Sequence, residues 1–249
     1  MTKDAVPTYF GHRERLRQRY KSGEGKDMAD YELLELLLTV LIPRKDVKPI
    51  AKDLIAKFGD FNKVVSAPLN ELIEVKGIKE NTALMIKFIK TCTLRASWQD
   101  LHSSDAPIIA NFDALIDYCR ASMADLPIEE FHLIYLNAKV QVIGEETLQR
   151  GTIDKVAVHP REVIKAAMAN NARGIILVHN HPSGDINPSV ADKEITKQII
   201  DAAKTVDLYV FDHIVVSKSD VYSFRAHGLL EFYLPPKNAK EAQERMMNL

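Results

Sequence analysis

The spacing of apolar residues changes near residue 100, and this change restricts the folds open to the chain. From about residue 28 to residue 94, apolar residues recur every three or four positions, which predicts amphipathic helices. After residue 107, helix-like segments alternate with short runs rich in β-branched and aromatic residues. We therefore predict an α+β protein, with an all-helical domain over residues 1–100 and a mixed sheet flanked by helices over residues 101–249.

The second domain contains four strand-like runs. Phe131–Leu136 and Val140–Ile143 are separated by three residues and predict an antiparallel hairpin. Gly174–Val178 and Leu208–Val216 predict two further strands. Because a hairpin makes antiparallel neighbours whereas strands joined through a helix can run parallel, the sheet should be mixed. Helices are predicted over residues 111–123, 160–168 and 190–206.

Composition narrows the setting and the chemistry. The polar segment Trp98–Pro107 is the predicted linker, and charge differs across it: residues 1–100 carry net +4 and residues 101–249 carry net −5. The N-terminus is polar and basic, and the apolar runs fall short of the roughly 18 residues that span a bilayer, so we expect a cytoplasmic chain without a membrane partner. Two cysteines, Cys92 and Cys119, are too few for a cysteine-based zinc site. A metal site must therefore use histidines and carboxylates.

Residues suited to metal binding concentrate between His179 and Asp192. His179 and His181 follow a strand-like apolar run, and side chains two residues apart on a strand share a face. Ser189 precedes a predicted helix whose first turn holds Asp192, so this carboxylate can return to the histidine face. Two imidazoles and one carboxylate leave the fourth position of a tetrahedral Zn²⁺ open, as in catalytic sites. The same spacing also fits a helix capping box between Ser189 and Asp192, which needs no metal.

These residues resemble a known family. The spacing His-x-His, seven residues, then Ser-x-x-Asp is similar to that of the JAMM (JAB/MPN) metalloproteases, and the string HNHPSGD from His179 to Asp185 resembles the RadC family (UPF0758). That family pairs a helical N-terminal segment with a JAMM-like domain. Further RadC-like pieces extend the resemblance over nearly the whole chain: Gly151-Thr152, His159-Pro160-Arg161-Glu162, Asp212-His213 and Tyr222-Ser223-Phe224.

The resemblance implies a zinc-dependent hydrolase of peptide or isopeptide bonds acting on a protein or peptide. One Zn²⁺ per chain would be held by His179, His181 and Asp192. JAMM enzymes also use a glutamate on an early strand as general base, and we assign that role to Glu130, directly before Phe131. Glu129 is the competing residue, because a register error of one residue reverses the face of a strand.

The resemblance implies a second catalytic residue, and other residues near the site have open roles. Ser189 matches the family serine that hydrogen-bonds the developing oxyanion. Asp185 is an alternative ligand to Asp192, and two histidines with one carboxylate can also hold Fe(II). Asp212 and His213 lie within a β-rich run and are predicted to form a buried hydrogen-bonded pair that supports the sheet or the metal ligands.

The helical half has a different candidate function. Residues 72–83 look like a helix-hairpin-helix element, in which Lys76, Gly77 and Lys79 would face a DNA phosphate. Many such hairpins carry a second glycine where this chain has Lys79. The alternative to a hydrolase is therefore a DNA-binding or DNA-repair accessory protein whose metal fold is not catalytic. A basic run could add phosphate contacts or could simply be a solvated helix face: Arg13, Arg15, Arg17, Arg19 and Lys21.

Overall fold

The computed structural model describes residues 11–151, 158–218 and 220–230, and the chain divides into two compact units between Thr93 and Leu94. The first unit is helical, as predicted. Its core is formed by fully buried side chains from five helices, among them Leu38, Leu54, Val64, Leu72 and Ile86. The helices are α1 (His12–Gly23), α2 (Asp30–Leu41), α3 (Lys48–Phe58), α4 (Phe61–Ser66), α5 (Leu69–Ile73) and α6 (Glu80–His102).

Helix α6 continues through the first residues of the predicted linker, so the linker prediction is wrong for residues 98–102. Leu94, Trp98 and Leu101 follow helical spacing and pack against the core of the second unit. This packing stabilises a helix that the polar composition of the segment does not suggest. Among the described residues, no helix combines the length and the apolar character needed to cross a membrane.

The second unit has a five-stranded mixed sheet with strand order β2-β1-β3-β4-β5. The β3–β4 pair is parallel and the other pairs are antiparallel, which confirms the mixed sheet. The elements are a 3-10 turn η1 (Ile108–Asn111), α7 (Phe112–Met123), β1 (Glu130–Leu136), β2 (Val142–Arg150), α8 (Pro160–Ala169), β3 (Gly174–Asn180), α9 (Val190–Lys204), β4 (Tyr209–Val216) and β5 (Val221–Ser223).

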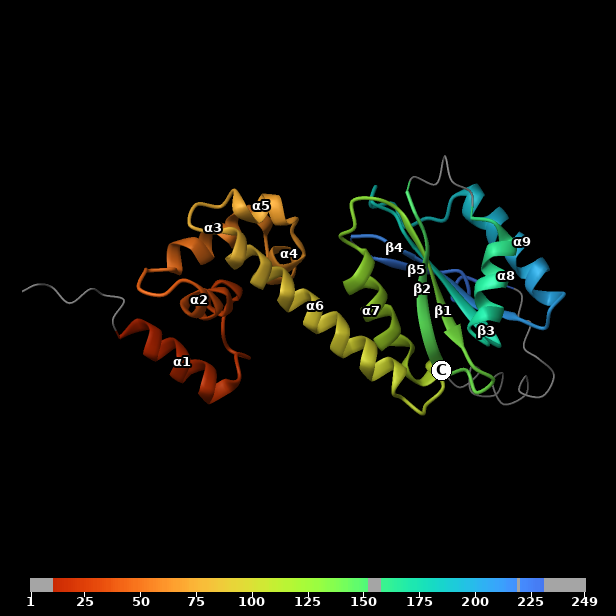
Figure 1. The fold of residues 1–249 in the computed structure, drawn as a ribbon, viewed down its shortest axis with the longest axis horizontal. Coiled ribbons are helices and arrows are strands. Elements are labelled where there is room, and N and C mark those ends of the chain that lie inside the picture. The colour runs from red at the N-terminus through yellow and green to blue at the C-terminus, as the bar shows by residue number, and fades with distance from the viewer. Residues whose placement is uncertain (1–10, 152–157, 219, 231–249) are drawn as a thin grey trace, which may run out of the picture. The chain divides into compact units, whose positions relative to one another are not determined.

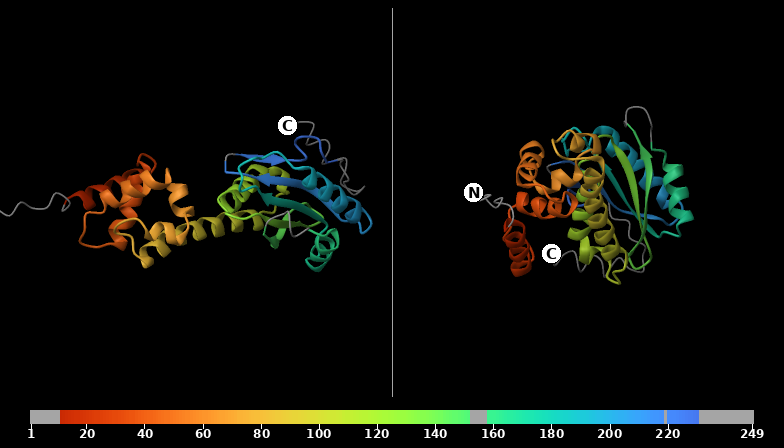
Figure 2. Two further views of the ribbon diagram at one scale, coloured as in Figure 1. Left: turned by 90° about the horizontal axis from the view of Figure 1, so that it is seen from above. Right: turned by 60° about the vertical axis from the view of Figure 1, so that its left-hand side comes forward.

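Helices cover both faces of the sheet, with α7 on one face and α8 and α9 on the other (Figure 1 and Figure 2). Alternation along β3 divides its side chains between these two layers. Ile176 and Val178 pack with α7, whereas Ile175 and Leu177 pack with α8 and α9. His179 therefore belongs to the α9 face, and this face carries the chemistry of the unit.

Two strands differ from the sequence prediction. The hairpin is present, but its second strand runs over Val142–Arg150 instead of Val140–Ile143. This strand lies at the edge of the sheet and has no buried residue after Val142, so its sequence is polar where a buried strand would be apolar. The short strand Val221–Ser223 was not predicted, because three residues are too few for a periodic signal.

Candidate metal centre

The structure brings His179, His181 and Asp192 together at the carboxyl end of β3. Their ligand atoms all lie within 4.8 Å of one another. His179 Nε2 is 2.9 Å from His181 Nε2 and 3.3 Å from Asp192 Oδ1, and His181 Nε2 is 3.5 Å from Asp192 Oδ2. All three side chains are buried. Local geometry brings about this convergence, because β3 presents the histidines and the first turn of α9 presents the carboxylate.

The chemistry of this donor set fits a divalent cation. His181 Nδ1 lies 2.6 Å from the carbonyl oxygen of Asp185, and because a carbonyl only accepts, Nδ1 donates and Nε2 is left for a ligand. Two imidazole nitrogens 2.9 Å apart beside a carboxylate cannot all direct lone pairs at one another, so a hydrogen or a cation must lie among them. Asp185 takes part through its backbone, while its carboxylate accepts hydrogen bonds from Asn187. The structure thus does not bring the Asp185 carboxylate to the ligands.

Electrostatics keep the carboxylate of this group ionised. Burial alone would raise the pKa of Asp192, but the neighbouring imidazoles of His179 and His181 outweigh it and hold that pKa well below its ordinary value. The Asp192 carboxylate in turn raises the pKa of His181, against the opposing effect of burial. The residues therefore attract one positive charge to this point, and a metal ion can supply it in place of a proton.

Ser189 forms the capping box with Asp192. Its backbone N–H and its hydroxyl each donate to Asp192 Oδ2 at 2.7 Å, and its Oγ accepts from the Asp192 backbone N–H at 3.1 Å. These bonds orient the ligand carboxylate from the helix N-terminus. The structural role of Ser189 is thus observed, and its role toward an oxyanion stays a prediction.

A cleft of about 760 Å³ opens beside the three ligands. His181, Ser189 and Asp192 line it, together with Glu129, which comes from the segment before β1. The charge of Glu129 contributes to the raised pKa of His181, after the larger effect of Asp192. Glu129 thus lies within electrostatic reach of the ligand group.

Glu130, the predicted general base, points elsewhere. Its carboxylate lies 2.9 Å from His132 Nε2 and 3.3 Å from Arg150 Nε, on the opposite face of β1. The reason is strand parity: Phe131 pairs with His179 and its ring stacks on that imidazole, so residues 129 and 131 share the metal face and Glu130 does not. This geometry does not agree with the assignment to Glu130 and instead favours Glu129.

Asn180, between the two histidines, holds the backbone on both sides of Glu129. Its Oδ1 accepts from the Glu130 N–H at 2.8 Å, and its Nδ2 donates to the Ile128 carbonyl at 3.0 Å. Asn180 is 1% exposed, so water does not compete for these bonds. Sequence reasoning missed this residue, because its partners lie about 50 positions away.

The predicted pair of Asp212 and His213 is divided between the two faces of the sheet. Both are fully buried, but an extra residue, Phe211, forms a bulge opposite the Ile175–Ile176 step and sets their directions. His213 faces His179, whose Nδ1 is 2.8 Å from His213 Nε2. Asp212 accepts from the His213 backbone N–H at 2.7 Å and from Ser223 Oγ, away from the histidine group. The predicted hydrogen-bonded pair is therefore present through the backbone, and only the His213 side chain contacts a candidate ligand.

The helical unit presents the predicted DNA-contacting residues at one turn. Lys76, Gly77 and Lys79 are exposed between α5 and α6. Gly77 has a φ of 99°, and a Cβ there would lie 2.7 Å from Ile50 Cδ1, so folding alone requires a glycine. In the basic run, the Arg13 guanidinium donates to the backbone carbonyls of Thr39, Ile42 and Lys45, at the end of α2 and just after it. Arg13 thus has a structural role.

Comparisons with known proteins agree with this arrangement. A family model for the RadC-like JAB domain matches residues 109–229, which include the complete ligand group. A UPF0758 protein of Ruegeria pomeroyi is 44% identical over 226 residues, which is 90% of this chain and all of that protein. The chain belongs to the RadC (UPF0758) family. A UPF0758 protein of Rhodobacter capsulatus is 43% identical over 215 residues, 86% of this chain and all of that protein. The second unit is thus a JAB-type domain.

Proposed function

We propose that this RadC protein is a zinc-dependent hydrolase of amide bonds, in peptides or isopeptides, with one Zn²⁺ held by His179, His181 and Asp192. The observation that carries this proposal is the convergence of three buried ligand atoms beside an open cleft. Two imidazoles and one carboxylate leave a coordination position for a reactant, as in catalytic zinc sites. When bound there, Zn²⁺ would act as a Lewis acid and make water a nucleophile near neutral pH.

Glu129 is the proposed general base. It lines the cleft beside His181, and the Asn180 amide fixes the peptide groups on both sides of it. Its carboxylate would accept the proton of the attacking water and later deliver it to the leaving amine. Ser189 lines the same cleft, and its hydroxyl would turn from Asp192 to donate to the oxyanion formed during attack.

The matched variants Glu129→Gln and Glu130→Gln test these roles, because each removes one carboxylate from neighbouring positions. Cleavage of a peptide library and of isopeptide-linked peptides would be followed by mass spectrometry, with zinc content measured on the same samples. Glu129→Gln should retain zinc and lose at least about 100-fold in rate, and Glu130→Gln should stay within a few-fold of the parent. Full activity in Glu129→Gln would refute the base assignment. A zinc-loaded parent that cleaves none of these substrates would count against a hydrolase.

A second proposed function is DNA binding by the helical unit. It is supported by the exposed turn at Lys76, Gly77 and Lys79, where backbone N–H groups and two ammonium groups can meet phosphates. The full chain would be titrated with duplex DNA at several salt concentrations. Affinity should fall with salt and should weaken in a Lys76→Ala/Lys79→Ala variant. Equal affinity in parent and variant would exclude this turn, and the domain would then serve another partner.

A further inference from the structure

A buried chain of hydrogen bonds runs from the backbone of α9 to the first metal ligand. Thr196 Oγ1 donates to the Asp192 carbonyl at 2.5 Å and lies 2.6 Å from His213 Nδ1. His213 Nε2 lies 2.8 Å from His179 Nδ1. Thr196, His213 and His179 are 2%, 0% and 1% exposed, so solvent does not supply alternative partners.

The direction of each hydrogen bond follows from donor counting. A hydroxyl has one hydrogen, and Thr196 gives it to the Asp192 carbonyl, which can only accept. His213 Nδ1 must then be the donor to Thr196 Oγ1. A neutral His213 consequently accepts at Nε2, so His179 Nδ1 carries a hydrogen and donates it. His179 Nε2 is left with a lone pair directed at His181 and Asp192.

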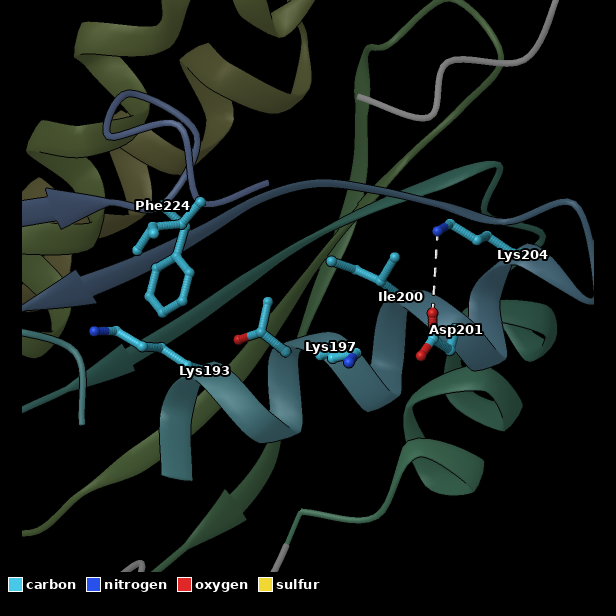
Figure 3. A pocket seen from close by; sticks show the side chains of 8 residues that line it. Lys193, Lys197, Ile200, Asp201, Lys204 and Phe224 are labelled. Atoms are coloured by element: carbon cyan, nitrogen blue, oxygen red, sulfur yellow. Dashed lines mark ion pairs between the residues drawn. The ribbon is translucent and has the colours of Figure 1, made fainter. Parts of the chain in front are cut away.

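The surroundings of His213 keep it neutral. Its ring stacks on Phe224 with centroids 4.6 Å apart and meets the edge of Phe131 at 5.7 Å. Phe224 comes from the segment after β5 and projects toward α9 (Figure 3). A charged imidazole between two phenyl rings would lose its hydration, and it would also be repelled by a cation at the ligand group.

We propose that Thr196 and His213 are positioning residues that fix the tautomer of His179, so that its Nε2 is ready to bind a metal before the metal arrives. This proposal rests on the metal site of the proposed function, but it does not depend on hydrolysis. The two histidine ligands are then oriented by different means. His181 relies on the Asp185 carbonyl in a loop, whereas His179 relies on a relay anchored in α9.

Two variants of Thr196 separate this role from general packing. Thr196→Ser keeps the hydroxyl, and Thr196→Val keeps the shape but removes the only acceptor identified for His213 Nδ1 among the described residues. Zinc affinity of the full chain would be measured by competition with a chelating dye. Thr196→Val should bind zinc about 10- to 100-fold more weakly, with Thr196→Ser close to the parent. Equal zinc affinity in Thr196→Val and the parent would overturn the proposal.

A second measurement needs no substrate, and its main readout comes from the parent chain. Long-range ¹H–¹⁵N spectra of the metal-free chain, labelled with ¹⁵N-histidine, distinguish the two neutral tautomers of each of the eight histidines. His179 and His213 should both carry hydrogen on Nδ1, and His213 should change in Thr196→Val. A parent chain whose His179 carries no hydrogen on Nδ1 refutes the relay. Neither zinc affinity nor the histidine spectra depend on catalysis. Absence of hydrolysis would therefore count against the proposed function but not against the relay.

Discussion

The buried carboxyl group of Asp212 should make the second unit less stable as pH rises. Its side chain is 0% exposed and accepts hydrogen bonds from Ser223 Oγ at 2.5 Å and from the Arg225 backbone N–H at 3.0 Å. Burial raises the pKa of Asp212 to about 6, and the hydrogen bonds offset this effect only in part. In the unfolded chain the same carboxyl group has a pKa of about 3.9.

The folded chain therefore keeps a proton that the unfolded chain has released over roughly pH 4 to 6. The resulting contribution to the free energy of unfolding is fully present below the unfolded pKa and is lost as pH rises through the folded pKa. The full difference corresponds to about 3 kcal/mol, of which about 2 kcal/mol falls between pH 4.5 and pH 7.5.

Asp212→Asn is the matched variant, because asparagine has a similar shape and does not titrate. Both proteins would be unfolded with urea in the presence of a chelator at these two pH values. The single tryptophan, Trp98, packs on the core of the second unit, so its fluorescence reports on that unit. The stability of the parent relative to Asp212→Asn should fall by about 2 kcal/mol on going from pH 4.5 to pH 7.5. A difference that stays constant, or that moves in favour of the parent, would show that folding does not raise the pKa of Asp212.

Three further predictions concern packing. Gly77→Ala should destabilise the helical unit by roughly 1–2 kcal/mol, measured by circular dichroism during urea unfolding, because alanine is strained at a φ of 99°; an unchanged midpoint would contradict this. Gly174→Ala should lower the free energy of unfolding of the second unit by about 1–3 kcal/mol, since a Cβ there would lie 2.2 Å from the Tyr209 ring. Urea unfolding followed by Trp98 fluorescence would measure this change, and an unchanged free energy would contradict the prediction. Burial raises the pKa of the Cys119 thiol, whereas Cys92 is exposed. A thiol reagent should therefore label only Cys92 in the native chain. Labelling of both cysteines would contradict the burial of Cys119 in the core of the second unit.

Short-range rules explain why the ligand group could be predicted from sequence. His179 and His181 are two residues apart at the end of a strand, and Asp192 lies in the first turn of the next helix, where Ser189 caps it. Each relation depends on residues close together in the chain, so strand alternation and helix capping predict that the three side chains converge, while their assignment as metal ligands came from the family resemblance. The two-part organisation and the mixed sheet followed in the same way from changes of periodicity.

Long-range register explains what could not be predicted. The choice between Glu129 and Glu130 depends on Phe131 pairing with His179, and the strand after Glu130 is apolar on both faces, so its sequence does not reveal which face meets the metal. The contact of His213 with His179 depends on the bulge at Phe211, which changes the parity of β4. The helix over residues 98–102 was missed, and the edge strand β2 was predicted with the wrong bounds, because tertiary packing and edge exposure outweighed local composition.

The proposed function requires that His179, His181 and Asp192 hold one zinc ion. We would measure the metal content of the untagged chain, purified without chelator, by mass spectrometry beside the His179→Ala/His181→Ala variant. We expect close to one zinc per chain in the parent and none in the variant, with both proteins folded by circular dichroism. A parent that contains no zinc, even after zinc is supplied and excess removed, would show that these residues do not hold zinc, and a variant that retains zinc would place the ion elsewhere.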